Sequence, residues 1–255
     1  MRSLPGPVKR ILILGGTGDA RVLAGLLAGR TSFSPVSSLA GATSSPNLPA
    51  GEVRVGGFGG VEGLKSFLRE DSIDLVVDAA HPFAVRISEN AKTATEALGI
   101  PLLRLTRPPW TPQAGDRWHG FDSIQDAAKS LPSGARVLLT LGSRDLAPFF
   151  AREDIFWVAR MIEPPSLRVP SNASILLAPP AESAEEEAAL LRAEAIDWLV
   201  SKNAGGRGAE AKLAAARALS LPVAMIPRPV KPPASSVPTP EEMVGAIESL
   251  FGGQG

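Results

Sequence analysis

Short apolar segments alternate with helix-patterned segments along almost the whole of this 255-residue chain. Residues 10–14 (RILIL) form the first apolar run. After a glycine turn, residues 18–28 repeat valine and leucine at the spacing of one helix face. Alternation of this kind predicts parallel sheets covered by helices on both faces, because each connection between parallel strands crosses a face of the sheet.

The predicted elements fall into two blocks. Strands are expected at residues 10–14, 35–40, 52–55, 74–78 and 101–105, and again at 136–141, 155–161, 174–177, 198–201 and 223–226. Helices are expected at residues 18–28, 61–69, 82–98, from 144 onward, and at 182–193, 207–220 and 241–251.

A proline-rich stretch at residues 107–118 (RPPWTPQAGDRW) interrupts this rhythm and is interpreted as the crossing between two domains. We predict an α/β protein with Rossmann-like domains at residues 1–106 and 119–255, each built on a parallel sheet, with cofactor and substrate in the cleft between them. A loose echo between residues 12–23 (LILGGTGDARVL) and 138–149 (LLTLGSRDLAPF) fits a pair of similar lobes.

Composition excludes several classes of protein. The 26 basic residues balance the 26 acidic ones, whereas nucleic-acid and membrane-surface proteins need a basic excess for their phosphate partners. No apolar stretch is long enough for a transmembrane helix, and the N-terminus has no apolar signal core, so we expect a cytoplasmic protein. Cysteine is absent, which excludes disulfides and thiolate chemistry. Tyrosine is also absent, so the Tyr-x-x-x-Lys proton-transfer pair of short-chain dehydrogenases cannot form.

A glycine turn, GGTGD at residues 15–19, follows the first predicted strand directly. A turn that opens a helix offers backbone N–H groups and a positive dipole end to a phosphate. The turn does not match G-x-G-x-x-G, so a plain strand-to-helix turn stays the alternative to a nucleotide site.

The end of the second strand bears on the choice of cofactor. NAD enzymes place an acidic residue there, but residues 37–44 (SSLAGATS) contain none, and small hydroxyl residues favour NADP. Arg21 could reach a 2′-phosphate from the first helix, or could be a solvated surface arginine.

His81 follows the strand at residues 74–78, at the sheet edge where open α/β folds place their ligands. Pro82 suits the first turn of a helix, so we expect His81 at or beside an N-cap. Metal binding is not expected, because the one other histidine, His119, lies across the predicted crossing. We interpret His81 as lining or orienting a ligand crevice, with acid/base catalysis and a buried structural role as the alternatives.

A second polar turn, SKNAGGRG at residues 201–208, combines a lysine, an amide, glycine N–H groups and an arginine. These groups predict an anion-binding corner at the end of a strand in the second domain. A polar loop that merely caps the next helix is the alternative.

Eight blocks of the chain together resemble the precorrin-6A reductase family of cobalamin biosynthesis. They run in family order from residue 11 to about residue 229: ILILGGTGDAR, SSLAGA, VRVGGFGGVEGL, DLVVDAAHPFA, RLTRPPW, GDRW, VLLTLGSRDLAPF and LVSKNAGGRGAEAKLAAARALSLPV. The chain departs from the family at Ala80, where threonine is frequent, at Ala42, where an arginine commonly follows the SLAG segment, and at residues 178–180, which replace the common GPF block.

The resemblance implies an oxidoreductase that acts on a CH–CH group. It implies hydride transfer from NADPH to C19 of precorrin-6A, a polycarboxylate tetrapyrrole, giving precorrin-6B. The alternatives are a cobalt-precorrin-6A reductase, another nucleotide-dependent enzyme such as a methyltransferase, and a non-catalytic NADP-binding sensor. We expect a monomer or a small homo-oligomer.

These expectations define three sets of candidate residues. The NADPH-binding candidates are Gly15, Gly16, Thr17, Gly18, Asp19, Arg21, Ser38, Ala40, Gly41, Ala79 and His81. The substrate's carboxylates need cationic and N–H anchors, for which the candidates are Lys202, Asn203, Gly205, Gly206, Arg207, Arg144 and Arg107. No dedicated acid is required, and if one exists the candidates are His81 and Asp145.

Overall fold

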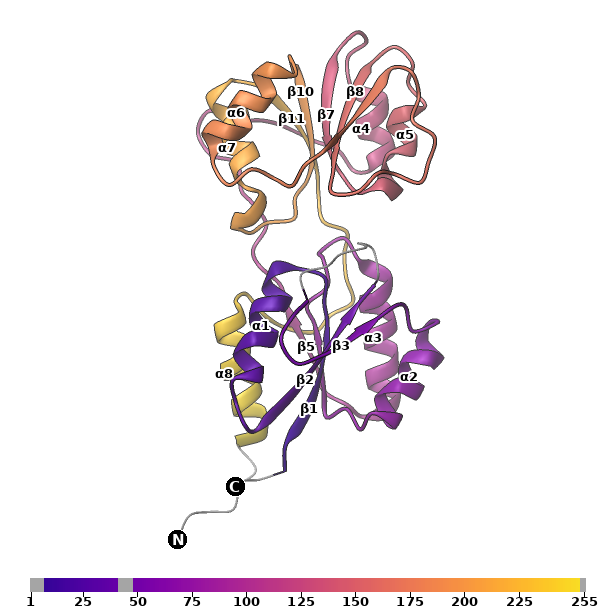
Figure 1. Cartoon of the computed structure of the whole chain (residues 1–255), viewed down its shortest axis with the longest axis vertical. Helices are drawn as coiled ribbons and strands as arrows, with labels where there is room; N and C mark the ends of the chain where they lie inside the picture. The colour runs from indigo at the N-terminus through magenta and orange to yellow at the C-terminus, as the bar shows by residue number, and fades with distance from the viewer. Residues whose placement is uncertain (1–6, 41–47, 253–255) are drawn as a thin grey trace. The chain divides into compact units, whose positions relative to one another are not determined.

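A computed structural model describes residues 7–40 and 48–252 of the chain. The chain forms two compact units (Figure 1): unit 1 comprises residues 1–108 and 229–255, and unit 2 comprises residues 109–228. Each unit has one six-stranded sheet in which every pairing is parallel. The predicted α/β architecture with two parallel-sheet lobes is therefore confirmed.

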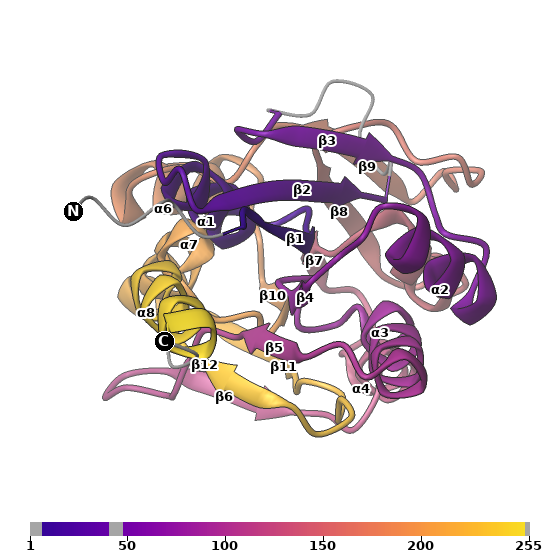
Figure 2. The ribbon, with the colours of Figure 1, turned by 90° about the horizontal axis from the view of Figure 1, so that it is seen from below.

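The sheet of unit 1 has the order β12-β5-β4-β1-β2-β3. Its strands are β1 (Lys9–Leu14), β2 (Phe33–Leu39), β3 (Glu52–Val55), β4 (Leu75–Asp78), β5 (Leu102–Leu105) and β12 (Ser235–Val237). The helices are α1 (Gly18–Ala28), α2 (Val61–Glu70), α3 (Val85–Leu98) and α8 (Pro240–Gly252). Helices α1 and α8 cover one face of the sheet, and α2 and α3 cover the other (Figure 2).

The central strands of unit 1 are apolar on both faces, which is why they form the middle of the sheet. In β1, Ile11 and Ile13 pack toward α1 and α8, while Leu12 and Leu14 pack toward α2 and α3. All four side chains are at most 2 % exposed. A strand buried on both faces carries a continuous apolar run instead of an alternating one.

The sheet of unit 2 has the order β6-β11-β10-β7-β8-β9. Its strands are β6 (Arg117–Gly120), β7 (Arg136–Thr140), β8 (Phe156–Met161), β9 (Ala173–Leu177), β10 (Trp198–Lys202) and β11 (Pro222–Ile226). The helices are α4 (Ile124–Ser130), α5 (Ala147–Phe150), α6 (Ala184–Ala193) and α7 (Ala211–Ala218), with single 3₁₀ turns η1 (Ser143–Asp145) and η2 (Arg207–Ala209).

Both sheets follow the strand order 3-2-1-4-5-6 of doubly wound folds that bind nucleotides. In unit 1 the sixth position is taken by β12, which comes last in the chain. In unit 2 it is taken by β6, which comes first in that unit. The strand order reverses between β1 and β4 in unit 1 and between β7 and β10 in unit 2, and ligands of such sheets bind at this switch point.

The predicted second domain, residues 119–255, was wrong at its end. Residues 229–255 return to unit 1, where β12 pairs with β5 and α8 buries Met243, Val244 and Ile247 against the α1 side of the sheet. The predicted crossing at residues 107–118 also contains the start of β6. Edge strands of three or four residues beside proline-rich sequence carry no apolar pattern, so the sequence does not reveal them.

The helix expected to start at Pro82 starts instead at Val85. Residues 81–84 form a turn in which the Ala84 N–H donates to the His81 carbonyl oxygen over 2.8 Å. Helix α4 was not predicted. Within residues 7–40 and 48–252, no helix combines the length and the apolar character needed to cross a bilayer.

Candidate functional site

The turn between β1 and α1 lies at the carboxyl edge of the unit 1 sheet, at the switch point. The Gly15 N–H donates to Ser38 O over 2.9 Å, which joins the turn to the end of β2. Gly16 has a φ of 98°, a conformation that favours glycine. The Thr17 hydroxyl caps α1 by accepting from Ala20 N (3.1 Å) and donates to Ala79 O (2.9 Å). One side chain thus ties the glycine turn to the end of β4.

Neither the backbone conformation nor the packing of the described residues requires a glycine at position 18. Its φ is not in the positive range, and a Cβ built on it would meet nothing within 4 Å. The space beside the first turn of α1 is open, and the first N–H groups of a helix have no partner inside the helix. The turn therefore has room and donors for an anionic group.

Asp19 in the first turn of α1 would repel an anion, but its charge is balanced. Arg107, which follows β5, lies against it with Nη1 2.8 Å from Oδ2. Arg107 was predicted as an anchor for the substrate, together with residues of the second domain. The structure puts it in unit 1, at the glycine turn.

Most predicted cofactor residues meet at this edge of unit 1, where the ends of β1, β2 and β4 are in register. Arg21 is exposed on α1, and Ala40 is exposed directly after β2. Gly41 lies outside the described residues. The residues that the structure brings together are Gly15, Gly16, Thr17, Gly18, Asp19, Ser38 and Ala79.

Arg54 of β3 is a further basic residue at this edge, and it was not among the candidates predicted from the sequence. It is paired in register with Ser38. Its guanidinium donates to the carbonyl oxygens of Gly56 (2.5 Å) and Gly57 (2.8 Å) and lies 4.0 Å from the ring centroid of Phe58. The signal was its place in VRVGGFGG, immediately before a glycine turn.

His81 is exposed in the turn after β4. Its Nδ1 accepts the N–H of Phe83 over 3.3 Å, and its carbonyl oxygen accepts from Ala84. A neutral ring that accepts at Nδ1 carries its proton on Nε2. The imidazole therefore helps to shape the turn, next to Ala79 and the glycine turn.

The corresponding switch point of unit 2 brings together Lys202 at the end of β10 and Asp145 in η1. Their charged groups lie 2.5 Å apart, with side chains 16 % and 23 % exposed. Both residues were candidates from the sequence, Lys202 as a substrate anchor and Asp145 as a proton donor, but their pairing was not predicted. Arg144, beside Asp145, is exposed.

The turn after β10 is held by Trp110, which was assigned to the crossing, and by Arg228. The Asn203 amide is engaged with the backbone of Trp110: Oδ1 accepts from Trp110 N (2.8 Å) and Nδ2 donates to Trp110 O (2.9 Å). Trp110 Nε1 donates to Gly206 O (2.9 Å), and Arg228 donates to the carbonyl oxygens of Asn203 and Ala204.

Asn203 is thus a structural clamp in this arrangement and not an open anchor. Gly205 and Gly206 have φ values of 66° and 79°, which the turn requires. The side chain of Arg207 lies outside the described part of the chain. Trp110 and Arg228 were missed as contributors, although RPPW and IPRP mark where the chain enters and leaves unit 2.

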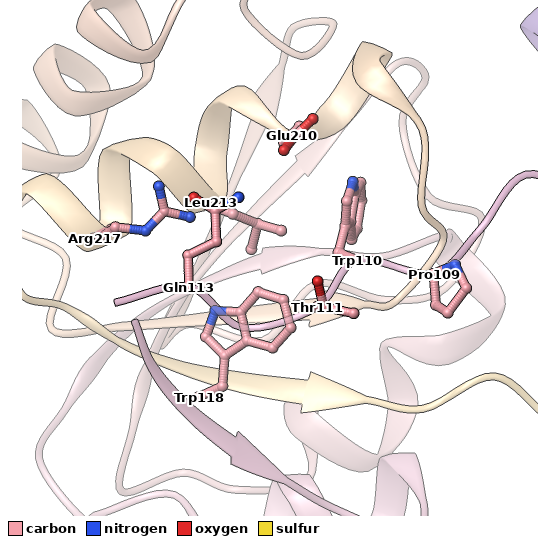
Figure 3. A pocket seen from close by; sticks show the side chains of 8 residues that line it. All are labelled: Pro109, Trp110, Thr111, Gln113, Trp118, Glu210, Leu213 and Arg217. Carbon is pink, nitrogen blue, oxygen red and sulfur yellow. The ribbon is translucent and has the colours of Figure 1, made fainter. Parts of the chain in front are cut away.

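Unit 2 also has a shallow pocket of about 180 Å³ between residues 109–113 and α7 (Figure 3). Trp118 lines it, and the Nε1 of this indole is buried without a hydrogen-bond partner. Lys212 of α7 is buried, with Nζ 5.4 Å from the ring centroid of Trp110, which lines the pocket. Burial, aided by the charge of Arg160, lowers the pKa of Lys212 to about 8. None of the predicted anchors lines this pocket.

No group of three or more histidine, aspartate or glutamate side chains in the described ranges could hold a metal ion.

The chain matches one protein family over most of its length: residues 10–248 match the family described as "Precorrin-6x reductase CbiJ/CobK". The precorrin-6A reductase of Rhodococcus erythropolis is 47 % identical over 239 residues, which cover 93 % of this chain and 96 % of that protein. The cobalt-precorrin-6A reductase of Priestia megaterium is 29 % identical over 251 residues, covering 93 % and 97 %. A solved structure of "CobK precorrin-6A reductase" superimposes with a TM-score of 0.91 at 40 % identity, covering 96 % of this chain and 98 % of the other.

Proposed function

Because this chain belongs to the precorrin-6x reductase family, we propose that it reduces precorrin-6A to precorrin-6B with NADPH as the hydride donor. The hydride goes to C19 of the macrocycle. The observation that carries the proposal is the turn from Gly15 to Asp19, whose Thr17 hydroxyl links the start of α1 to the end of β4 at the switch point of unit 1. Dinucleotides bind to doubly wound sheets at this position.

The residues present fit the phosphates of a dinucleotide. The open space beside Gly18 admits the pyrophosphate to the N-terminus of α1, an 11-residue helix whose dipole favours negative charge. Arg107 removes the repulsion that Asp19 would otherwise exert on that group. When bound, NADPH supplies the hydride, and the protein binds it, orients it and excludes competing chemistry.

The preference for NADPH over NADH is supported by the chemistry at the end of β2. Ser37 and Ser38 lie directly before Leu39, the last residue of β2, and residues 37–44 include no acidic residue to hold a ribose 2′-hydroxyl or repel a 2′-phosphate. Arg54 lies beside Ser38 in register and uses two of its five N–H donors on the turn after β3. We propose Arg54 and Arg21 as the cations that face the 2′-phosphate.

Unit 2 is proposed to hold the carboxylates of the macrocycle. Lys202 places a charged ammonium group at the end of β10, where it is hydrogen-bonded to Asp145. Arg144 adds an exposed guanidinium in η1, directly before Asp145. Asp145 is occupied by its hydrogen bond from Lys202, and we propose that water protonates the reduced macrocycle.

The test is anaerobic mixing of the purified protein with NADPH and precorrin-6A, in parallel with cobalt-precorrin-6A. Loss of NADPH absorbance with formation of a product two hydrogens heavier supports the reductase. The chain is 47 % identical to a precorrin-6A reductase and 29 % identical to a cobalt-precorrin-6A reductase. We therefore expect faster turnover of precorrin-6A than of cobalt-precorrin-6A. Tight NADPH binding without turnover of either substrate would instead support the non-catalytic sensor.

A further inference from the structure

A buried cluster of charged side chains lies under the turn that carries His81. Asp78 ends β4 and is fully buried. Arg104 of β5 donates from Nε to Asp78 Oδ2 over 2.9 Å, and Lys231 places Nζ 3.8 Å from the same oxygen. The side chains of Arg104 and Lys231 are 8 % and 9 % exposed. All three residues belong to unit 1, although Lys231 is more than a hundred residues further along the chain.

The cluster holds backbone groups on two separate segments. Asp78 Oδ1 accepts the N–H of Ala80 (3.2 Å), and Lys231 Nζ donates to the carbonyl oxygen of the same residue (3.4 Å). Arg104 Nη1 donates to Pro232 O (2.6 Å). The N–H and the C=O of Ala80 are therefore both bound from inside the cluster, directly before His81.

The glycine turn holds the neighbouring peptide. The Thr17 hydroxyl donates to Ala79 O, so each of the two residues that precede His81 is held, Ala79 by Thr17 and Ala80 by the charged cluster. Thr17 belongs to the turn to which we assign the cofactor phosphates. The distance from that turn to His81 is consequently set by Thr17 on one side and by the charged cluster on the other.

Stability alone does not account for this arrangement. Packed apolar residues of similar size are often as stabilising as a buried ion pair. Here Arg104 Nη2 is also buried without a hydrogen-bond partner, which makes the cluster less stabilising than a fully bonded ion pair. What charged groups add is direction, because each hydrogen bond fixes the position of one backbone group.

We infer that Asp78, Arg104 and Lys231 are positioning residues for the reduction, holding the His81 turn at a fixed distance from the glycine turn. This inference rests on the proposed function, because it assigns the glycine turn to NADPH. Hydride transfer is sensitive to such placement, since displacements of about 1 Å can slow an enzyme about 100-fold.

The decisive variant is Lys231→Met, which keeps the apolar stem and leaves the Asp78–Arg104 pair in place. The matched control is Lys92→Met, which removes an exposed ion pair with Glu96 on α3 of the same unit. For Lys231→Met we expect kcat to fall by about 10- to 100-fold while the dissociation constant for NADPH stays at the wild-type value. The primary isotope effect on kcat, measured with NADPH deuterated at both C4 positions, should rise. Lys231→Arg should restore most of kcat, and Lys92→Met should change nothing.

A second measurement needs neither substrate nor turnover. Amide hydrogen exchange of residues 79–84 should be faster in Lys231→Met than in wild type and unchanged in Lys92→Met, because the Ala80 carbonyl has lost a donor. A folded Lys231→Met protein with wild-type kcat and isotope effect would overturn the inference. So would unchanged exchange, or weaker NADPH binding at unchanged kcat, which would make the cluster part of the cofactor site. If the wild-type protein itself fails to oxidise NADPH, the proposed function fails. The exchange measurement still decides whether the charged cluster holds the His81 turn.

Discussion

Replacing Thr17 by valine tests the link between the glycine turn and the end of β4. Valine keeps the branched shape but loses the hydroxyl, and with it the cap on Ala20 N and the bond to Ala79 O. Loss of an N-cap costs about 1 kcal/mol, and a hydrogen bond contributes about 1 kcal/mol. Ala20 and Ala79 are 4 % and 2 % exposed, so water cannot readily replace the lost partner. We expect unfolding to become easier by about 2 kcal/mol, which lowers Tm by about 4–8 °C in a protein of this size.

Two variants separate the contributions. Thr17→Ser keeps the hydroxyl and should retain wild-type stability. Thr239 caps α8 through Glu242 N but holds no second segment, so Thr239→Val should cost about 1 kcal/mol. The Thr239 hydroxyl also donates to the exposed Glu242 carboxylate over 3.0 Å, within the same turn of helix. The difference between the two valine variants therefore compares a bond to a buried, distant segment with a bond to an exposed neighbour.

The assay is thermal unfolding with and without NADPH, supported by direct titration of the cofactor. Because Thr17 preorganises the turn, Thr17→Val should weaken NADPH binding by about tenfold, or 1.4 kcal/mol. Thr239→Val should leave it unchanged. If Thr17→Val is no less stable than Thr239→Val, or binds NADPH as tightly as wild type, the link does not organise a cofactor site.

Three further outcomes are expected. Lys202→Ala should raise KM for precorrin-6A far more than it weakens NADPH binding, and steady-state kinetics showing the reverse would move Lys202 to the cofactor. His81→Ala should keep measurable turnover, since its imidazole shapes a turn; a loss beyond about 10⁴-fold in a folded variant would identify an acid/base catalyst. Lys212 has its pKa lowered to about 8 by burial, so the unfolded chain binds more protons above that pH, and the free energy of unfolding should rise from about pH 8 to about pH 10.5. Urea titrations should show this rise in wild type and not in Lys212→Met, and cysteine and tyrosine, which would titrate in the same window, are absent.

The sequence predicts the central elements of the fold well. The helix expected at residues 18–28 and the strand expected at 52–55 have the predicted bounds, and most other elements differ by a few residues at their ends. These segments carry strong local signals: apolar runs for buried strands, helical spacing, and glycine turns between them. Both switch-point turns were found for the same reason.

What the sequence did not predict depends on contacts between distant segments. Residues 229–255 belong to unit 1 because β12 pairs with β5, more than a hundred residues earlier, and no local pattern records that pairing. Arg107 was assigned to the substrate because its charge is visible in the sequence, whereas its pairing with Asp19 is not. The Asp78–Arg104–Lys231 cluster was missed because its members come from three separate segments.

The two units place different chemistry at the same topological position. In unit 1 a neutral threonine joins the turn after β1 to the end of β4, and α1 extends for 11 residues beyond it. In unit 2 an ion pair joins the turn after β7 to the end of β10, and α5 has four residues. A helix of four residues aligns few peptide dipoles and offers little attraction to a phosphate, while an ammonium attracts carboxylates without a helix. The echo between residues 12–23 and 138–149 is therefore structural, and the difference within it is what leads us to assign phosphates to unit 1 and carboxylates to unit 2.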